Sequence, residues 1–169
     1  EREGRNCTVA EMDRLTERFI AHYAEHIADE SRPFEGVTTA LDTLAEQGFR
    51  FAVCTNKLEW LAKRLLDRLA LSARFDAICG ADTFGVSKPD PVFLRQTARQ
   101  AGGHIAATIM VGDAGTDIGV ARRAGVPVIG VTFGYTETPI ADLKPDRLIS
   151  RMADLPEAVE SLIGTRESA

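Results

Sequence analysis

The chain has 169 residues, a formal net charge of −5 and 44% hydrophobic residues, a length that predicts about one domain with a real core. No basic tract indicates nucleic-acid binding, no apolar run approaches the roughly 20 residues of a membrane span, and the first residues do not resemble a signal peptide. Three unclustered cysteines fit a reducing compartment better than secretion, so we expect a cytoplasmic protein.

The first part of the chain is predicted to form an amphipathic helix. Over residues 9–28, apolar residues recur at steps of three or four and form one stripe on the helix. Thr8 is expected to be the N-cap, and Glu11 completes a capping box. The stripe consists of Met12, Leu15, Phe19, Tyr23 and Ile27. Residues 31–36 are expected to form a linker.

After the linker, short apolar runs alternate with helical patterns. Strands are predicted at residues 51–54, 77–79, 108–111, 126–131 and 147–149. Helices are predicted at residues 37–47, 58–69, 91–101, 116–124 and 155–163. Because strands that alternate with helices are joined in parallel by crossover connections, the predicted fold class is α/β, with a parallel sheet covered by helices on both faces.

Two carboxylates follow the strand predicted at residues 108–111. The strand leads into Gly112, and Asp113 and Asp117 follow it one helical turn apart. Ligands bind at the carboxyl ends of the strands in an open α/β sheet, and two converging carboxylates need a positive partner such as Mg2+. The alternative is that Asp113 is a turn residue and Asp117 a cap of the next helix.

The strand predicted at residues 51–54 is followed directly by Thr55 and Asn56. One interpretation is that the Thr55 hydroxyl and nearby backbone N–H groups hold an anion at a helix N-terminus. The other is that Thr55 and Asn56 are only N-caps of the helix that begins near Leu58.

Lys88 lies in a loop of turn residues and is followed by Pro89. Most lysines are solvated on the protein surface. Lys88, however, is restricted by the proline and stands just before the helix predicted to begin at Pro91. An ammonium group held there suits a phosphate oxygen or a pair of carboxylates.

Thr55, Lys88 and the pair of Asp113 and Asp117 resemble, in this order, three motifs of the haloacid dehalogenase-like (HAD) hydrolase superfamily. These motifs are a strand ending in Thr or Ser, a Lys often followed by Pro, and Gly-Asp-x-x-x-Asp. Each motif alone is weakly specific, but the ordered set is strongly specific. The resemblance implies a Rossmann-like α/β core over residues 33–169, with residues 1–32 as the C-terminal part of a helical cap.

The nucleophile motif of this family, Asp-x-Asp-Gly-Thr after a first strand, is not found in the sequence. Asp13, Asp29 and Asp42 lie in helical or linker context, without a preceding apolar strand. In the family, the first strand lies between the strands that end at Thr55 and Gly112, and each buried polar group left unpaired there costs about 1–3 kcal/mol. We therefore expect the C-terminal portion of a longer polypeptide, with a core that lacks its first strand and is inactive by itself.

The resemblance also implies a mechanism, phosphate monoester hydrolysis through an aspartyl-phosphate with Mg2+ as the cofactor. Thr55 and the N–H of Asn56 would bind the phosphoryl oxygens, and Lys88 would neutralise the phosphate and the nucleophile. Asp113 and Asp117 would form the metal site, with Asp117 orienting either Lys88 or the water shell of the metal.

The expected substrate follows from residues 129–135, which resemble the Gly-Val-Thr-x-Gly-Tyr run of phosphoglycolate phosphatases. We expect a small phosphorylated metabolite, 2-phosphoglycolate, with Arg32 as the candidate cation for its carboxylate. The alternatives are another HAD phosphotransferase, such as a sugar-phosphate phosphatase or a phosphomutase, or an inactive fragment. His22 and His26 lie one helical turn apart without a third ligand nearby, so we expect surface or interface histidines rather than a zinc site.

Overall fold

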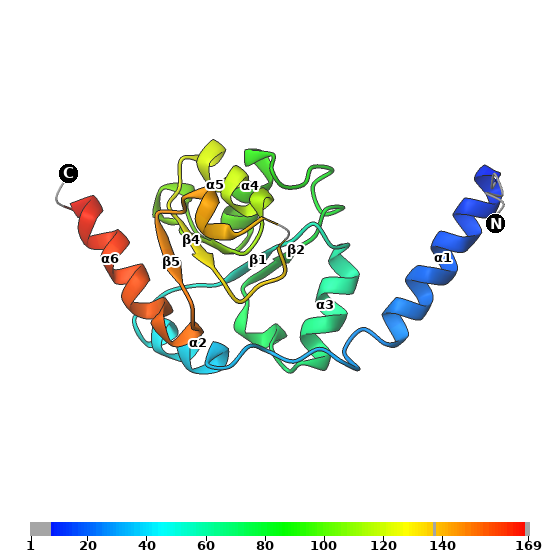
Figure 1. Cartoon of the computed structure of the whole chain (residues 1–169), viewed down its shortest axis with the longest axis horizontal. Helices are drawn as coiled ribbons and strands as arrows, with labels where there is room; N and C mark the ends of the chain where they lie inside the picture. The colour runs from blue at the N-terminus through cyan, green and yellow to red at the C-terminus, as the bar shows by residue number, and fades with distance from the viewer. Residues whose placement is uncertain (1–7, 137, 168–169) are drawn as a thin grey trace. The chain divides into compact units, whose positions relative to one another are not determined.

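The computed structural model describes residues 8–136 and 138–167, and the chain divides into two compact units. The first unit is Glu1–Arg32 and the second is Pro33–Ala169. Among the residues that the structure describes, the first unit contains one helix, and the second contains five strands and the remaining helices (Figure 1). Within the described part of the chain, no helix is long and apolar enough to cross a membrane.

Helix α1, Val9–Glu25, begins with the predicted capping box. The Thr8 N–H donates to Glu11 Oε2 at 2.9 Å, and Thr8 Oγ1 accepts from the Glu11 N–H at 3.3 Å. The helix ends before residue 28, the predicted end, because His26 leaves the helical geometry at φ −103° and ψ 16°.

The second unit consists of five short strands and five α-helices among the described residues. The strands are β1 Ala52–Cys54, β2 Ala77–Cys79, β3 Met110–Gly112, β4 Val128–Val131 and β5 Arg147–Ile149. The α-helices are α2 Val37–Glu46, α3 Glu59–Arg68, α4 Pro91–Gln100, α5 Gly115–Ala124 and α6 Leu155–Glu167. The predicted alternation of strands and helices is therefore confirmed.

Two predicted strand starts are two residues too early, and each has a local cause. Strand β3 begins at Met110 because Ile105–Ala107 form a 3-10 helix. Strand β4 begins at Val128 because Gly125 ends α5 in the left-handed region, at φ 73°, and the Val126 N–H returns to the Ala121 carbonyl at 3.0 Å. A glycine suits that C-terminal position because it has no Cβ to clash.

All strand pairs are parallel, but the described strands form two sheets. One sheet is β1–β2, in which Cys54 is in register with Cys79, and the other is β3–β4–β5. Successive residues of β4 point to opposite faces, and Val128 packs in a cluster with α4 and α5, whereas Ile129 packs in a cluster with α2 and α6. The three-stranded sheet is therefore covered by helices on both faces.

The strands β1 and β3 are each paired on one side only among the described residues. Strands of parallel sheets are normally buried on both faces. Val111 in the middle of β3 is nevertheless 37% exposed, and Ala52 in β1 is exposed as well. The uncovered apolar side chains of this core therefore include residues of β1 and β3, each of which has an unpaired edge among the described residues.

Candidate active site

The predicted site residues lie in the segments that follow β1, β2 and β3. Thr55 and Asn56 come directly after β1, and Lys88 lies between β2 and α4. Asp113 comes directly after β3, and Asp117 lies in the first turn of α5. Hydrogen bonds between these segments bring all five residues into one neighbourhood.

Lys88 and Asp117 form a buried ion pair at the centre of this neighbourhood. The distance from Lys88 Nζ to Asp117 Oδ1 is 2.5 Å, and the two side chains are only 10% and 6% exposed. Asp117 Oδ2 accepts the N–H groups of Asp113 and Ala114, each at 3.1 Å. Asp117 therefore binds Lys88 with one oxygen and the N–H groups at the start of α5 with the other. It can be both a helix cap and a residue of the site.

Gly112 permits this arrangement because it has no side chain. A Cβ at Gly112 would lie 2.3 Å from Asp117 Oδ2, far inside van der Waals contact. The glycine between the strand and the carboxylates thus allows Asp117 to pack directly on the end of β3.

The Asp113 carboxylate is supported by the segment that follows β4. Asp113 Oδ2 accepts the Tyr135 N–H at 2.8 Å. Gly134 also packs against Asp113, since a side chain at this glycine would place its Cβ 2.1 Å from Asp113 Cβ. We did not predict Gly134 and Tyr135 as site residues, although residues 129–135 served to predict the substrate, and a glycine after an apolar strand is the signal that could have identified them.

The carboxylate of Asp113 has the donor chemistry that suits Mg2+, which takes oxygen ligands and commonly uses one or two carboxylates together with substrate phosphates and water. A carboxylate has about four acceptor positions. At Asp113, within the described residues, the Tyr135 N–H occupies one of these positions. Asp117 is less available because both of its oxygens are bonded. No cluster of three or more metal-ligating side chains is found among the described residues. Since Mg2+ commonly uses one or two carboxylates, Asp113 fits as one of its ligands.

Thr55 and Asn56 do not cap α3, which excludes the simpler of the two interpretations. The N-cap of α3 is Leu58, and the Glu59 N–H is satisfied by Asp82 Oδ1 at 2.7 Å. Thr55 Oγ1 instead accepts the Lys57 N–H at 3.2 Å. In that bond the Thr55 hydroxyl is the acceptor, so the hydroxyl hydrogen can still be donated to a ligand.

Asn56 binds the backbone of Lys88, which is 32 positions away. Asn56 Oδ1 accepts the Lys88 N–H at 2.8 Å, and Asn56 Nδ2 donates to the Lys88 carbonyl at 3.0 Å. The loop after β1 is thereby tied to the loop that carries the lysine.

Cys54, the residue before Thr55, is not suited to nucleophilic chemistry. Burial raises the pKa of its thiol to about 11, although the Lys88 ammonium acts in the opposite direction. The thiolate is the nucleophilic form of cysteine, so Cys54 stays protonated and unreactive at neutral pH. It packs instead against the apolar clusters under α4.

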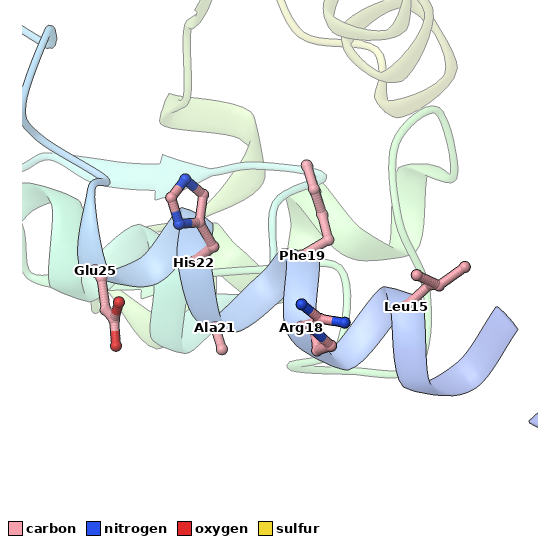
Figure 2. Close-up of a pocket in the computed structure, with 6 residues that line it drawn as sticks. All are labelled: Leu15, Arg18, Phe19, Ala21, His22 and Glu25. Carbon is pink, nitrogen blue, oxygen red and sulfur yellow. The ribbon is translucent and has the colours of Figure 1, made fainter. Parts of the chain in front are cut away.

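The remaining candidates from the sequence, Arg32, His22 and His26, make their contacts within the first unit. Arg32 Nη1 donates to the carbonyls of Ala28, Asp29 and Ser31. The rings of His22 and His26 are tilted by 46° with centroids 4.5 Å apart, and His26 Nδ1 lies 2.6 Å from Asp29 Oδ2. Figure 2 shows a shallow hollow on α1, lined by Leu15, Arg18, Phe19, Ala21, His22 and Glu25. Because one helix forms this hollow alone, it contains none of the five predicted site residues.

Comparison with known proteins identifies the class. Residues 4–131 match the haloacid dehalogenase-like hydrolase family, and the chain belongs to this family, as the three motifs predicted. It is 47% identical over 161 residues to a phosphoglycolate phosphatase of Agrobacterium fabrum, covering 95% of this chain and 69% of that protein. It is 43% identical over 160 residues to a phosphoglycolate phosphatase of Mesorhizobium japonicum, covering 94% and 70%.

A solved structure is similar over the same part of the chain. The crystal structure of a predicted phosphoglycolate phosphatase from Haemophilus somnus superposes with a TM-score of 0.85 at 29% identity, covering 91% of this chain and 69% of that one. The predicted fold class, a HAD-like α/β core with parallel strands, is therefore confirmed.

Proposed function

We propose that the chain carries the phosphate-binding and metal-binding part of a Mg2+-dependent phosphate monoester hydrolase that acts on 2-phosphoglycolate. The observation that carries this proposal is the linked set of Lys88, Asp117 and Asp113, which lie in the segments that follow the parallel strands β2 and β3. The substrate is supported by the relatives named phosphoglycolate phosphatase at 47% and 43% identity.

The roles of the residues follow from their contacts. Lys88, held by Asp117, would face a phosphoryl oxygen and offset its charge, while the Thr55 hydroxyl and the Asn56 N–H would donate to the other oxygens. Asp113 would hold Mg2+, which neutralises phosphate charge when bound. These side chains are fixed before substrate arrives, and preorganised charge is usually the largest catalytic contribution.

We propose that the attacking carboxylate lies on a further strand between β1 and β3. This is supported by the edges of β1 and β3 that are unpaired among the described residues and by the 37% exposure of Val111 in β3. A carboxylate at the end of such a strand would lie among Thr55, Lys88 and Asp113 and would form the aspartyl-phosphate.

We further propose that residues 1–32 are part of a helical cap, with Arg32 as the cation for the substrate carboxylate. The division of the chain after Arg32 supports the boundary. The two free thiols of Cys54 and Cys79, which are in register on adjacent strands, support a reducing cytoplasmic location.

The test is a hydrolysis assay on the full-length gene product with a panel of phosphate monoesters, with and without Mg2+. We expect Mg2+-dependent release of phosphate, fastest from 2-phosphoglycolate, and loss of that activity in Lys88→Ala. The Arg32→Ala variant should raise KM for 2-phosphoglycolate but not for p-nitrophenyl phosphate, which has no carboxylate. Activity in Lys88→Ala equal to that of the wild type would contradict the proposed site, and isomerisation of a sugar phosphate without net phosphate release would indicate a mutase.

A further inference from the structure

Asn56 holds the backbone of Lys88 with both polar atoms of its side chain. We propose that Asn56 is a positioning residue, which acts on the reaction by fixing where Lys88 stands, and that its side chain does not itself bind the substrate. The observation behind this is the pair of hydrogen bonds of 2.8 Å and 3.0 Å between the Asn56 amide and the Lys88 N–H and carbonyl.

Lys88 lies in an irregular loop, in a turn closed by the Asp90 N–H and the Ser87 carbonyl at 2.9 Å. The segment from β2 to α4 runs over residues 80–90 without a strand or α-helix. Lysine is a point charge on a flexible four-carbon stem, so its position depends on how its backbone is fixed. Asp117 holds the ammonium end at 2.5 Å, and Asn56 holds the backbone end. The residue is therefore fixed at both ends, by β1 through Asn56 and by α5 through Asp117.

The chemistry of the bridge requires a carboxamide. It needs one acceptor for the Lys88 N–H and one donor for the Lys88 carbonyl, and a carboxamide provides both in one plane. An aspartate accepts but cannot donate, and its charge would face the Lys88 carbonyl oxygen. An alanine does neither, so Asn56→Asp and Asn56→Ala should both release the loop.

The inference rests on the proposed function, and a double-mutant cycle on the full-length gene product tests it. Asn56→Ala should lower kcat by about tenfold, the effect expected from loss of two exposed hydrogen bonds. In a Lys88→Ala background, the same substitution should change the residual rate by less than about twofold, because interactions that act through one residue are not additive. If Asn56 bound the phosphate directly, the two effects would add, and that result would overturn the proposal.

A matched control removes another exposed carboxamide. Gln47, the C-cap of α2, donates from Nε2 to Glu160 Oε1 of α6 at 2.8 Å, and neither α2 nor α6 carries a site residue. Gln47→Ala should leave kcat unchanged. A loss of activity in Gln47→Ala equal to that in Asn56→Ala would show a general structural effect and would count against the proposal.

A measurement that needs no activity separates this proposal from the proposed function. In the wild-type protein the Lys88 amide hydrogen should exchange slowly with solvent, because Asn56 accepts it, and Asn56→Ala should accelerate its exchange by about tenfold or more. If the wild type hydrolyses no phosphate ester but Asn56→Ala accelerates this exchange, the proposed function fails while the positioning holds. Unchanged exchange at Lys88 in Asn56→Ala would refute the positioning role itself.

Discussion

The Lys88 ammonium and the Asp117 carboxylate lie 2.5 Å apart and are almost fully withdrawn from solvent. Removing one member of such a pair strands the other charge in a poorly solvated place, whereas removing both does not. The pair therefore ties the stability of the core to the integrity of the site.

Substitution of the pair should show this coupling. Lys88→Met should lower the free energy of unfolding by about 3 kcal/mol because Asp117 loses its cation. The double variant Lys88→Met with Asp117→Asn should recover more than half of that loss, since an asparagine oxygen can still accept the N–H groups of Asp113 and Ala114. Urea unfolding of the full-length gene product measures both, and equal stability of the single and double variants would contradict the coupling.

Gly134 should be intolerant of any side chain. Gly134→Ala places a Cβ 2.1 Å from Asp113 Cβ, so the carboxylate must move. We expect the Mg2+ concentration for half-maximal activity to rise by about tenfold, as when other supports of a metal ligand are lost. Gly164→Ala is the control, because a Cβ there would meet no atom within 4 Å from the other elements that the structure describes, and it should leave the metal dependence unchanged.

Asp113 is predicted to be the ligand that makes the reaction metal-dependent. Asp113→Asn keeps the acceptor for the Tyr135 N–H but removes the negative charge that attracts Mg2+. Activity should fall by about 100-fold and recover in part at higher Mg2+. Titration of activity with Mg2+ after treatment with EDTA checks this, and an unchanged titration curve in Asp113→Asn would show that the metal binds elsewhere.

The hydroxyl of Thr55 is predicted to donate to the substrate. Thr55→Val keeps the shape of the side chain but removes the hydroxyl, and kcat/KM should fall by about 100-fold, as for loss of one donor to a charged oxygen. Thr55→Ser keeps the hydroxyl and should stay within about fivefold of the wild type. Similar losses in both variants would indicate that the methyl group matters, and not the hydroxyl.

The raised pKa of the Cys54 thiol predicts that the free energy of unfolding falls at alkaline pH. Its thiol has an ordinary pKa near 9.0 and, because of burial, a folded-state pKa of about 11. The folded state therefore keeps a proton that the unfolded state loses, so this contribution to stability is complete below pH 9 and declines as the pH rises toward 11. Urea unfolding between pH 8 and pH 10.5 should show a shallower decline in Cys54→Ala than in the wild type, and parallel declines would argue against the raised pKa.

Local patterns in the sequence were sufficient for most elements. The capping box of Thr8 and Glu11 and the proline at the start of α4 depend on neighbours within one helical turn, and both lie where they were predicted. The five strands were found from short apolar runs. Their bounds shifted by one residue at the start of β1 and the end of β3, and by two where Gly125 or a 3-10 helix took up the preceding residues. The family was also recognisable, because its motifs are short and ordered.

Contacts between distant loops could not be derived in this way. The sequence placed Asn56 and Asp113 directly after strands, Lys88 just before a helix and Asp117 at the start of one, and so determined which chemistry this edge of the core carries. Only the tertiary structure decided that Asn56 holds a backbone 32 residues away and that both oxygens of Asp117 are already bonded. It also decided that Gly134 packs on Asp113. The reason is physical: apolar periodicity and capping act within a few residues, whereas these hydrogen bonds form only after packing of α4 and α5 has brought separate strand ends together.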